Sequence, residues 1–326
     1  MGCDELSHET RAKREVLRGK MMPPKVVLGI VTRHRAAILP KAIDSAVAQT
    51  CANYGICVLD DGSTDDTSAV VRRYPNVTLI SWPNSQGYVA ARNYLMRNLA
   101  ADYFVSLDDD AWFLKGDEIA AGVNYLETRP NVAIVAFDVL SPDERTPRSR
   151  TEPRPTPTFI GCGHIARLAA IKKIGGYATA PGGYGGEEKD LSLRLMDAGY
   201  GVILMSGVHV WHEKTAVARD LVEQHRSGVC NDFAMALRRT PFALLPLALL
   251  AKLYRHFRFA RTHNLERPFW DGLQLFLQSI PELWQSREPV RFSTLQKYLK
   301  LNKEQGARHG EFVLRRTGSG EARKPS

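Results

Sequence analysis

The sequence is poor in cysteine, and its few cysteines form no recognisable pattern. The five lie at positions 3, 51, 57, 162 and 230, with no Cys-x-x-Cys pair and no even-numbered set. An apolar secretion signal is also lacking. These absences argue against a disulfide-stapled secreted domain, and we expect free thiols in a reducing cytoplasm.

Long apolar runs and nucleotide-binding loops are missing too. The most apolar stretch, "PFALLPLALLA" (241–251), is interrupted by Pro246 and is far shorter than the roughly 20 residues that cross a bilayer. No P-loop is present.

The formal charge of +9 suits an acidic partner such as a nucleotide, a lipid headgroup or nucleic acid. Because no nucleic-acid-binding module accompanies that charge, we expect no nucleic-acid partner.

Short apolar strands alternate with helical segments over the first two thirds of the chain. Strands are predicted at 26–31, 54–60, 77–81, 103–107 and 132–137, and helices at 36–49, 65–74, 87–100 and near 116–128. This alternation predicts an α/β fold with a largely parallel sheet flanked by helices. Ligands of such sheets bind beyond the carboxyl ends of the strands.

Composition also divides the chain. A charged leader over 1–24 is expected to be disordered, and a Pro- and Arg-rich stretch over 141–158 is predicted to be loop. The α/β pattern resumes through about residue 212 and gives way to helices without convincing strands. We therefore predict an α/β domain over 25–218, a helical appendage over 219–305 and a flexible tail over 306–326.

Two acidic clusters follow predicted strands. They are "LDDGSTDDT" (59–67) and the triplet within "SLDDDAW" (106–112). In an extended segment Asp108 and Asp110 point to one side, about 7 Å apart, and together suit a hard divalent cation such as Mg²⁺ or Mn²⁺. The simpler alternatives are helix capping for the first cluster and a solvated acidic turn for the second.

A third acidic cluster follows a glycine-rich loop in "PGGYGGEEKDLSLRL" (181–195). A flexible loop directly before Glu187 and Glu188 suits a catalytic base that meets its substrate after closure. Acids in the first turn of a helix are also favoured by the helix dipole without any function. Asp190 and Arg194, four residues apart, are expected to pair on the surface.

Six segments, in order, resemble those of inverting family 2 glycosyltransferases, which have the GT-A fold. They are "VTRHR" after the first strand, "LDDGSTDDT", "NSQGYVAARN", "SLDDDAW", "GGEEKDLSLRL" and "VWHEK", and they span about residues 25 to 215. The resemblance implies a GT-A-type sheet that binds a nucleotide sugar, with the helical appendage after it.

The resemblance also implies roles for individual residues. Donor-binding roles fall on Thr32, Asp61, Arg92, Asp108 and Asp109. A divalent ion, Mn²⁺ or Mg²⁺, would be bound by Asp110, Asp108 and His212. The catalytic base would be Glu188, with Glu187 as the neighbouring candidate, because many relatives have Glu-Asp where this chain has Glu-Glu.

The implied function is metal-dependent, inverting transfer of a sugar from a nucleotide-sugar donor, with UDP the expected nucleotide. The acceptor would be a hydroxyl of a glycan or a lipid-linked molecule. The alternative is a non-catalytic protein that has the same fold and binds sugar nucleotides or glycans.

The segment "GCGHIA" (161–166) mimics a dinucleotide fingerprint after a possible strand "TFI" and before a helix. It lacks the acidic residue that should follow about twenty positions later.

A basic segment follows the α/β domain. Residues 238–267 contain seven Lys or Arg and one acid, and aromatic residues lie between the basic ones. Such a segment suits attachment to an anionic membrane surface, which would make the protein peripheral at the inner face of the cytoplasmic membrane. A core helix with a basic outer side, or a contact between copies of the chain, is the alternative.

Overall fold

A mixed sheet of nine strands forms the centre of the computed structural model, which describes residues 25–142, 152–213 and 221–318. The strand order is β3-β2-β1-β4-β8-β6-β9-β5, and β7 pairs with β9. Their bounds are β1 Val26–Thr32, β2 Tyr54–Asp61, β3 Val77–Trp82, β4 Tyr103–Asp108, β5 Ala111–Phe113, β6 Val132–Leu140, β7 Arg154–Pro155, β8 Gly163–Arg167 and β9 Gly201–His212. The first four are mutually parallel, whereas β8 runs antiparallel to both β4 and β6.

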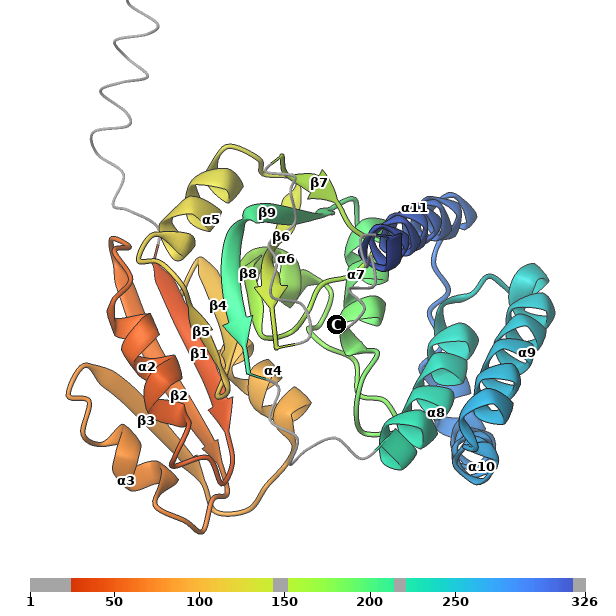
Figure 1. Ribbon diagram of the computed structural model, residues 1–326, viewed down its shortest axis with the longest axis horizontal. Coiled ribbons are helices and arrows are strands. Elements are labelled where there is room, and N and C mark those ends of the chain that lie inside the picture. Colours follow the sequence, from red (N-terminus) through yellow and green to blue (C-terminus); the bar gives the residue numbers. More distant parts are fainter. Residues whose placement is uncertain (1–24, 143–151, 214–220, 319–326) are drawn as a thin grey trace, which may run out of the picture.

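Helices cover both faces of the sheet (Figure 1). One apolar cluster joins the sheet to α2 (Leu39–Val47) and α5 (Glu118–Glu127). On the other face, a second cluster joins it to α4 (Tyr88–Asn98), α6 (Leu168–Lys173) and α7 (Glu187–Asp197). The short helix α3 (Thr67–Val71) connects β2 to β3. Because β1 and β4 are buried from both sides, their sequences are mostly apolar, with no alternation of apolar and polar residues.

The remaining helices form the appendage. They are α8 (Leu221–Arg239), α9 (Leu245–His263), α10 (Glu266–Gln285) and α11 (Phe292–Gly318), with a 3-10 turn at Phe242–Leu244. The first three share an apolar cluster of their own, and α11 packs on α7. Helix α11 runs past residue 305, where the predicted tail begins. Within the described residues, no helix combines the length and apolar character that crossing a bilayer requires.

The predicted α/β fold class is confirmed, but the sheet is mixed and not largely parallel, because four of its eight strand pairings are antiparallel. Three local expectations also differ from the structure. The stretch predicted as loop contains the two-residue strand β7, and β5 was not predicted. The segment "TFI" (158–160) is not a strand. Residues 163–167 form β8 between β4 and β6, so the glycines of "GCGHIA" do not precede a helix and cannot form a dinucleotide-binding turn there.

Candidate active site

A cavity of about 500 Å³ lies where β1, β2 and β4 end. The parallel register aligns Thr32 with Asp60 and Val31 with Asp108, so the polar residues that follow three strands meet at one edge. The cavity wall includes every predicted site residue: Thr32, Asp61, Arg92, Asp108, Asp109, Asp110, Glu187, Glu188 and His212. Residues separated by up to 180 positions in sequence thus share one site.

The three aspartates at the end of β4, Asp108 to Asp110, contact three different partners. Asp108 accepts a hydrogen bond from the Arg92 guanidinium. Asp109 lies 3.8 Å from Nε of Arg35, but its burial raises its pKa to about 7. An Asp110 Oδ1 lies 3.1 Å from Nε2 of His212. The repulsion within the triplet is therefore divided among separate positive or polar partners.

His212 reaches this triplet because of the strand that sequence reasoning missed. Antiparallel pairing of β5 with β9 sets Ala111 opposite His212, which brings the imidazole beside Asp110. The buried Nδ1 atom of His212 has no hydrogen-bond partner within the described part of the chain. An imidazole that lies beside the carboxylates of Asp108 and Asp110 and has one nitrogen without a partner fits a divalent metal ion.

Cys162 also lies at this position, and sequence reasoning did not select it. Its Sγ, a carboxylate oxygen of Asp108 and a ring nitrogen of His212 all lie within 4.8 Å of one another. The only sequence signal was the segment "GCGHIA", which was interpreted as an imitation of a dinucleotide fingerprint. Spacing could not find this residue, because it is 54 positions from Asp108 and 50 from His212.

The two glutamates at the start of α7 differ in environment. Glu187 is buried, and its Oε1 accepts a hydrogen bond of 2.6 Å from the Tyr88 hydroxyl. Burial, reinforced by the charge of Glu187, raises the pKa of Glu188 to about 8, although Arg92 acts in the opposite direction. Of the two, Glu188 has the properties of a proton acceptor that works near neutral pH.

Arg92 is a buried cation at the centre of these acids. Burial alone lowers the pKa of its guanidinium, but Asp108 and the two glutamates outweigh that effect and raise it. A Cβ atom at Gly161 would lie 2.7 Å from both Nη1 of Arg92 and Oε1 of Glu188. Glycine at this position therefore allows the backbone to approach the arginine and the candidate base together.

Asp61 holds the loop that leads into α4. Its carboxylate accepts hydrogen bonds from the Ser85 hydroxyl (2.7 Å) and from the amides of Gln86 (2.7 Å) and Gly87 (3.0 Å). Thr32, another residue predicted to bind the donor, is buried in the same wall. Asp61 thus shapes the cavity in addition to any contact with a ligand.

The glycine-rich loop before α7 is held by the helical appendage. The Asn231 side chain, on α8, donates to the carbonyls of Tyr184 (2.9 Å) and Gly185 (2.7 Å) and accepts from the Gly182 amide (2.8 Å). Tyr184 itself is exposed, with its ring 5.9 Å from that of Tyr88. In this conformation the loop lines the cavity beside the two glutamates.

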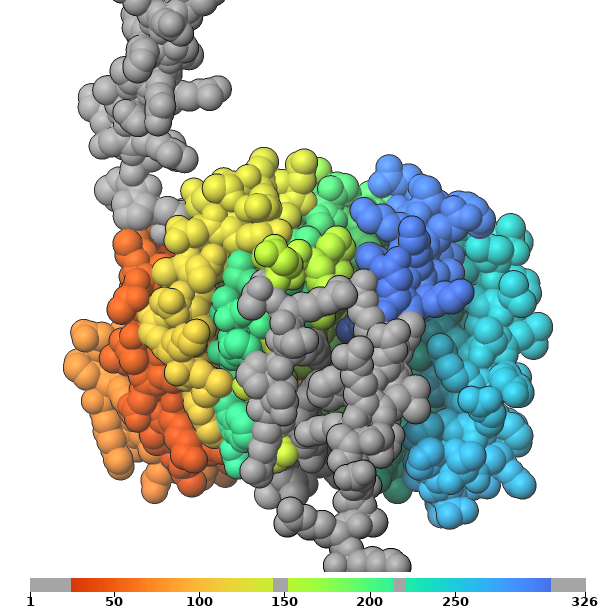
Figure 2. Space-filling model, turned by 45° about the horizontal axis from the view of Figure 1, so that its top comes forward, coloured from red at the N-terminus to blue at the C-terminus, as the bar shows by residue number. Residues whose placement is uncertain are grey.

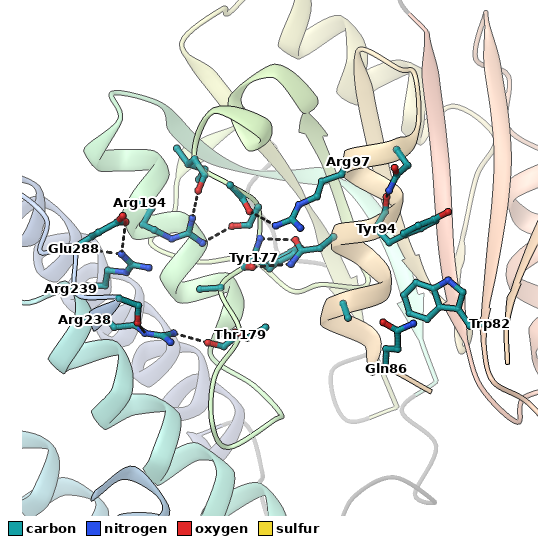
Figure 3. Close-up of a pocket in the computed structure, with 18 residues that line it drawn as sticks. Trp82, Gln86, Tyr94, Arg97, Tyr177, Thr179, Arg194, Arg238, Arg239 and Glu288 are labelled. Carbon is teal, nitrogen blue, oxygen red and sulfur yellow. Dashed lines mark hydrogen bonds and ion pairs between the residues drawn. The ribbon is translucent and has the colours of Figure 1, made fainter. Parts of the chain in front are cut away.

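A second cavity, of about 610 Å³, lies between α4 and the appendage (Figure 3). Asp190 on α7 binds the guanidinium groups of Arg194 (2.6 Å) and Arg239 (2.7 Å) in its wall. The predicted pairing of Asp190 with Arg194 is confirmed, but its expected position at the surface is wrong, because both side chains are largely buried. A spacing of four residues predicts a pair on one helix face, but it cannot show that another helix covers that face. Here α8 covers it and contributes Arg239.

Two family models match the chain. The model described as glycosyl transferase family 2 covers residues 28–179, and the model described as the N-terminal domain of galactosyltransferase covers residues 148–214. An uncharacterized glycosyltransferase of Rickettsia typhi is 30% identical over 114 residues, which are 35% of this chain and 36% of that protein. The match thus spans about a third of this curated relative's length.

Solved structures resemble the chain over a longer span. The mannosyltransferase PcManGT from Pyrobaculum calidifontis, in complex with GDP-Man and Mn²⁺, has a TM-score of 0.55 and 19% identity, covering 86% of this chain and 94% of that one. S. aureus TarS 1–349 has a TM-score of 0.57 and 17% identity, covering 79% and 81%. At these identities the likeness shows the fold alone.

Proposed function

The chain carries a glycosyl transferase family 2 domain with the GT-A fold, and on this premise we propose inverting sugar transfer from a nucleotide sugar to an acceptor hydroxyl. The observation that carries the proposal is the convergence of nine polar residues from distant segments in one cavity at the carboxyl ends of the strands. Such a set contains a candidate base, a buried cation and carboxylates suited to a divalent ion.

Glu188 is the proposed base. Its carboxylate accepts the proton of the acceptor hydroxyl while the hydroxyl oxygen bonds to the anomeric carbon. The bond from that carbon to the diphosphate oxygen breaks, and its electron pair leaves with the nucleotide. Attack from the face opposite the leaving group inverts the anomeric centre. Glu187 supports Glu188 instead, because its Oε1 already accepts the Tyr88 hydroxyl.

The remaining residues bind the donor. Asp108, Asp110 and His212 would hold Mn²⁺ or Mg²⁺, a choice supported by the orphaned Nδ1 of His212. When bound, the ion supplies positive charge that stabilises the departing diphosphate. Arg92 holds Asp108 in position from within the wall, and Asp109 extends the acidic side of the cavity. Thr32 and Asp61 border the proposed base-binding end.

The proposed donor is a UDP-sugar and the proposed acceptor a glycan or lipid-linked hydroxyl. Among the similar structures, PcManGT is a complex with GDP-Man and one form of TarS is a complex with UDP-GlcNAc. A protein that binds the nucleotide sugar without transferring it is the second candidate. It would need neither the raised pKa of Glu188 nor a base beside the cavity.

We expect the Asp110→Asn variant to lose metal-dependent donor binding. The substitution removes one anionic ligand of the proposed ion while keeping the size of the side chain. The measurement is thermal stabilisation by a panel of UDP-, GDP- and dTDP-sugars, each with Mn²⁺ or Mg²⁺, scored together with release of the nucleotide.

The matched control is Asp66→Asn, an exposed aspartate outside the cavity. It should keep the metal-dependent shift of the unmodified protein. A shift that survives in the Asp110 variant at the same metal concentration would show that this aspartate does not bind the ion.

Peripheral attachment to an anionic membrane through residues 238–267 is a further part of the proposal. Exposed apolar side chains on α9 include Leu247, Leu250, Tyr254 and Phe257, which lie three or four residues apart and so on one helix face. Arg255, Arg258 and Arg261 are exposed on the same helix. Figure 2 shows α9 (cyan) along one side of the molecule, remote from β2 and β3. An apolar face beside basic residues suits anionic lipid.

We expect the triple variant Arg255→Gln, Arg258→Gln, Arg261→Gln to bind anionic vesicles about 10²-fold more weakly, since each basic residue near such a surface contributes about 1 kcal/mol. Flotation with phosphatidylglycerol vesicles and with phosphatidylcholine vesicles measures this. The double variant Arg72→Gln, Arg73→Gln, exposed at the end of α3, is the control. Equal flotation of the triple variant and the control would contradict the role of the segment.

A further inference from the structure

Cys162 is a completely buried thiol at the edge of the candidate active site. It precedes β8 and is 0% exposed. Its Sγ forms a compact group with ligand atoms of Asp108 and His212, all within 4.8 Å of one another. These are the same two residues that the proposed function assigns to the metal ion.

The environment of Cys162 differs from that of the other fully buried thiols. Cys57 lies on β2 in the apolar cluster behind the sheet, and Cys230 lies in the apolar cluster of the appendage. Cys162 also touches apolar side chains, but charged groups act on it as well: Asp108 most strongly among the acids, and Arg92 in the opposite direction. A small apolar residue would fill the space equally well, and packing alone does not call for a sulfur beside an imidazole and a carboxylate.

The separations suit a shared ion. With bonds of about 2.3 Å to sulfur and about 2.1 Å to nitrogen or oxygen, two ligands at a tetrahedral angle on one ion are about 3.6 Å apart. The three ligand atoms lie within 4.8 Å of one another, so side-chain movements of about 1 Å would bring them onto a single ion. Sulfur, imidazole and carboxylate together are a ligand set typical of Zn²⁺ or Co²⁺, whereas Mg²⁺ selects oxygen ligands.

We propose that Cys162 is a ligand of the active-site metal, together with Asp108 and His212, and that it makes the site favour thiophilic divalent ions over Mg²⁺. On binding, the S–H bond breaks, the proton passes to solvent and the sulfur electron pair bonds to the metal. This rests on the proposed function only in taking Asp108 and His212 as metal ligands. It adds a residue that the family motifs did not select and an order of metal preference.

Cobalt titration of the full chain tests this without any substrate. In the unmodified protein we expect Co²⁺ to produce a sulfur-to-cobalt charge-transfer band in the near ultraviolet. Cys162→Ser should abolish the band and weaken Zn²⁺ binding at least tenfold, while Mg²⁺ binding changes little. Cys57→Ser, which alters a buried thiol outside the site, should keep both the band and the Zn²⁺ affinity.

Two results overturn the proposal. One is the absence of a charge-transfer band in the unmodified protein, which is decisive even if Cys162→Ser does not fold. The other is a band that persists in a folded Cys162→Ser variant. Failure of the proposed function looks different: no divalent ion then stabilises the unmodified protein, with or without a nucleotide sugar. If Mn²⁺ still stabilises the protein with UDP-sugar but no thiolate band forms, only the role of Cys162 is lost.

Discussion

Replacing Glu188 by glutamine should lower kcat by about 10²–10⁴-fold, the usual contribution of a positioned general base. The amide keeps the shape of the side chain beside Gly161 and Arg92 but cannot accept the proton of the acceptor hydroxyl. Donor binding should change little, because the donor contacts are assigned to other residues. Steady-state transfer kinetics together with donor titration separate the two effects.

The same carboxylate should set the pH profile. Burial raises the pKa of Glu188 to about 8, and a base works only when deprotonated. In the unmodified protein, kcat/KM should therefore fall as pH drops below about 8, and this limb should vanish in Glu188→Gln.

Glu187→Gln is the matched control, since it changes the adjacent acid, which the Tyr88 hydroxyl already occupies. This variant should lose much less of kcat and keep a pH limb, moved to lower pH because the charge of Glu187 no longer raises the pKa of Glu188. A larger loss in Glu187→Gln than in Glu188→Gln would reverse the assignment of the base. Undiminished donor binding with no transfer in the unmodified protein would favour the non-catalytic alternative.

The Asp190→Asn variant should be less stable by about 3–5 kcal/mol, the range for a buried ion pair that loses one partner. Asp190 lies between the guanidinium groups of Arg194 and Arg239, all three largely buried. Burial raises the pKa of Asp190, but the two arginines outweigh it and lower the pKa. At pH values above the ordinary pKa of an aspartate, these two ion pairs therefore stabilise the protein. This contribution is lost as the pH falls through the lowered pKa of Asp190.

Denaturant unfolding measures this loss. The control is Asp271→Asn, which removes a half-exposed aspartate 4.0 Å from the exposed Arg267. Its cost should not exceed about 1 kcal/mol, since solvent screens such pairs. Similar losses in the two variants would mean that the contact between α7 and α8 does not depend on this charge.

Much of the fold could be predicted from the sequence, because buried parallel strands have continuous apolar runs. The strands at 26–31, 54–60 and 103–107 lie where expected. The short strands β5 and β7 could not be predicted, since two or three residues carry no periodicity and pair only because β9 is present.

The candidate site shows the same division. Local motifs located the acids after β2 and β4 and at the start of α7, and the cavity brings them together. Contacts between distant segments escaped notice: Cys162 beside Asp108 and His212, Arg239 on Asp190, and Asn231 on the glycine-rich loop. None of these pairs has a characteristic spacing, because tertiary packing alone sets the distance.

The contact of Asn231 with the glycine-rich loop has a consequence for how this protein could be divided into fragments. A fragment ending at residue 218 would retain all nine polar cavity residues but would lose the Asn231 side chain, which bonds the backbone at Gly182, Tyr184 and Gly185. We therefore expect the glycine-rich loop to be less firmly held in the α/β portion alone, with Gly185 still bonded to the Tyr88 hydroxyl. A chimaera with a relative would therefore need α8 and the glycine-rich loop to come from the same protein, because Asn231 of α8 bonds the backbone of that loop.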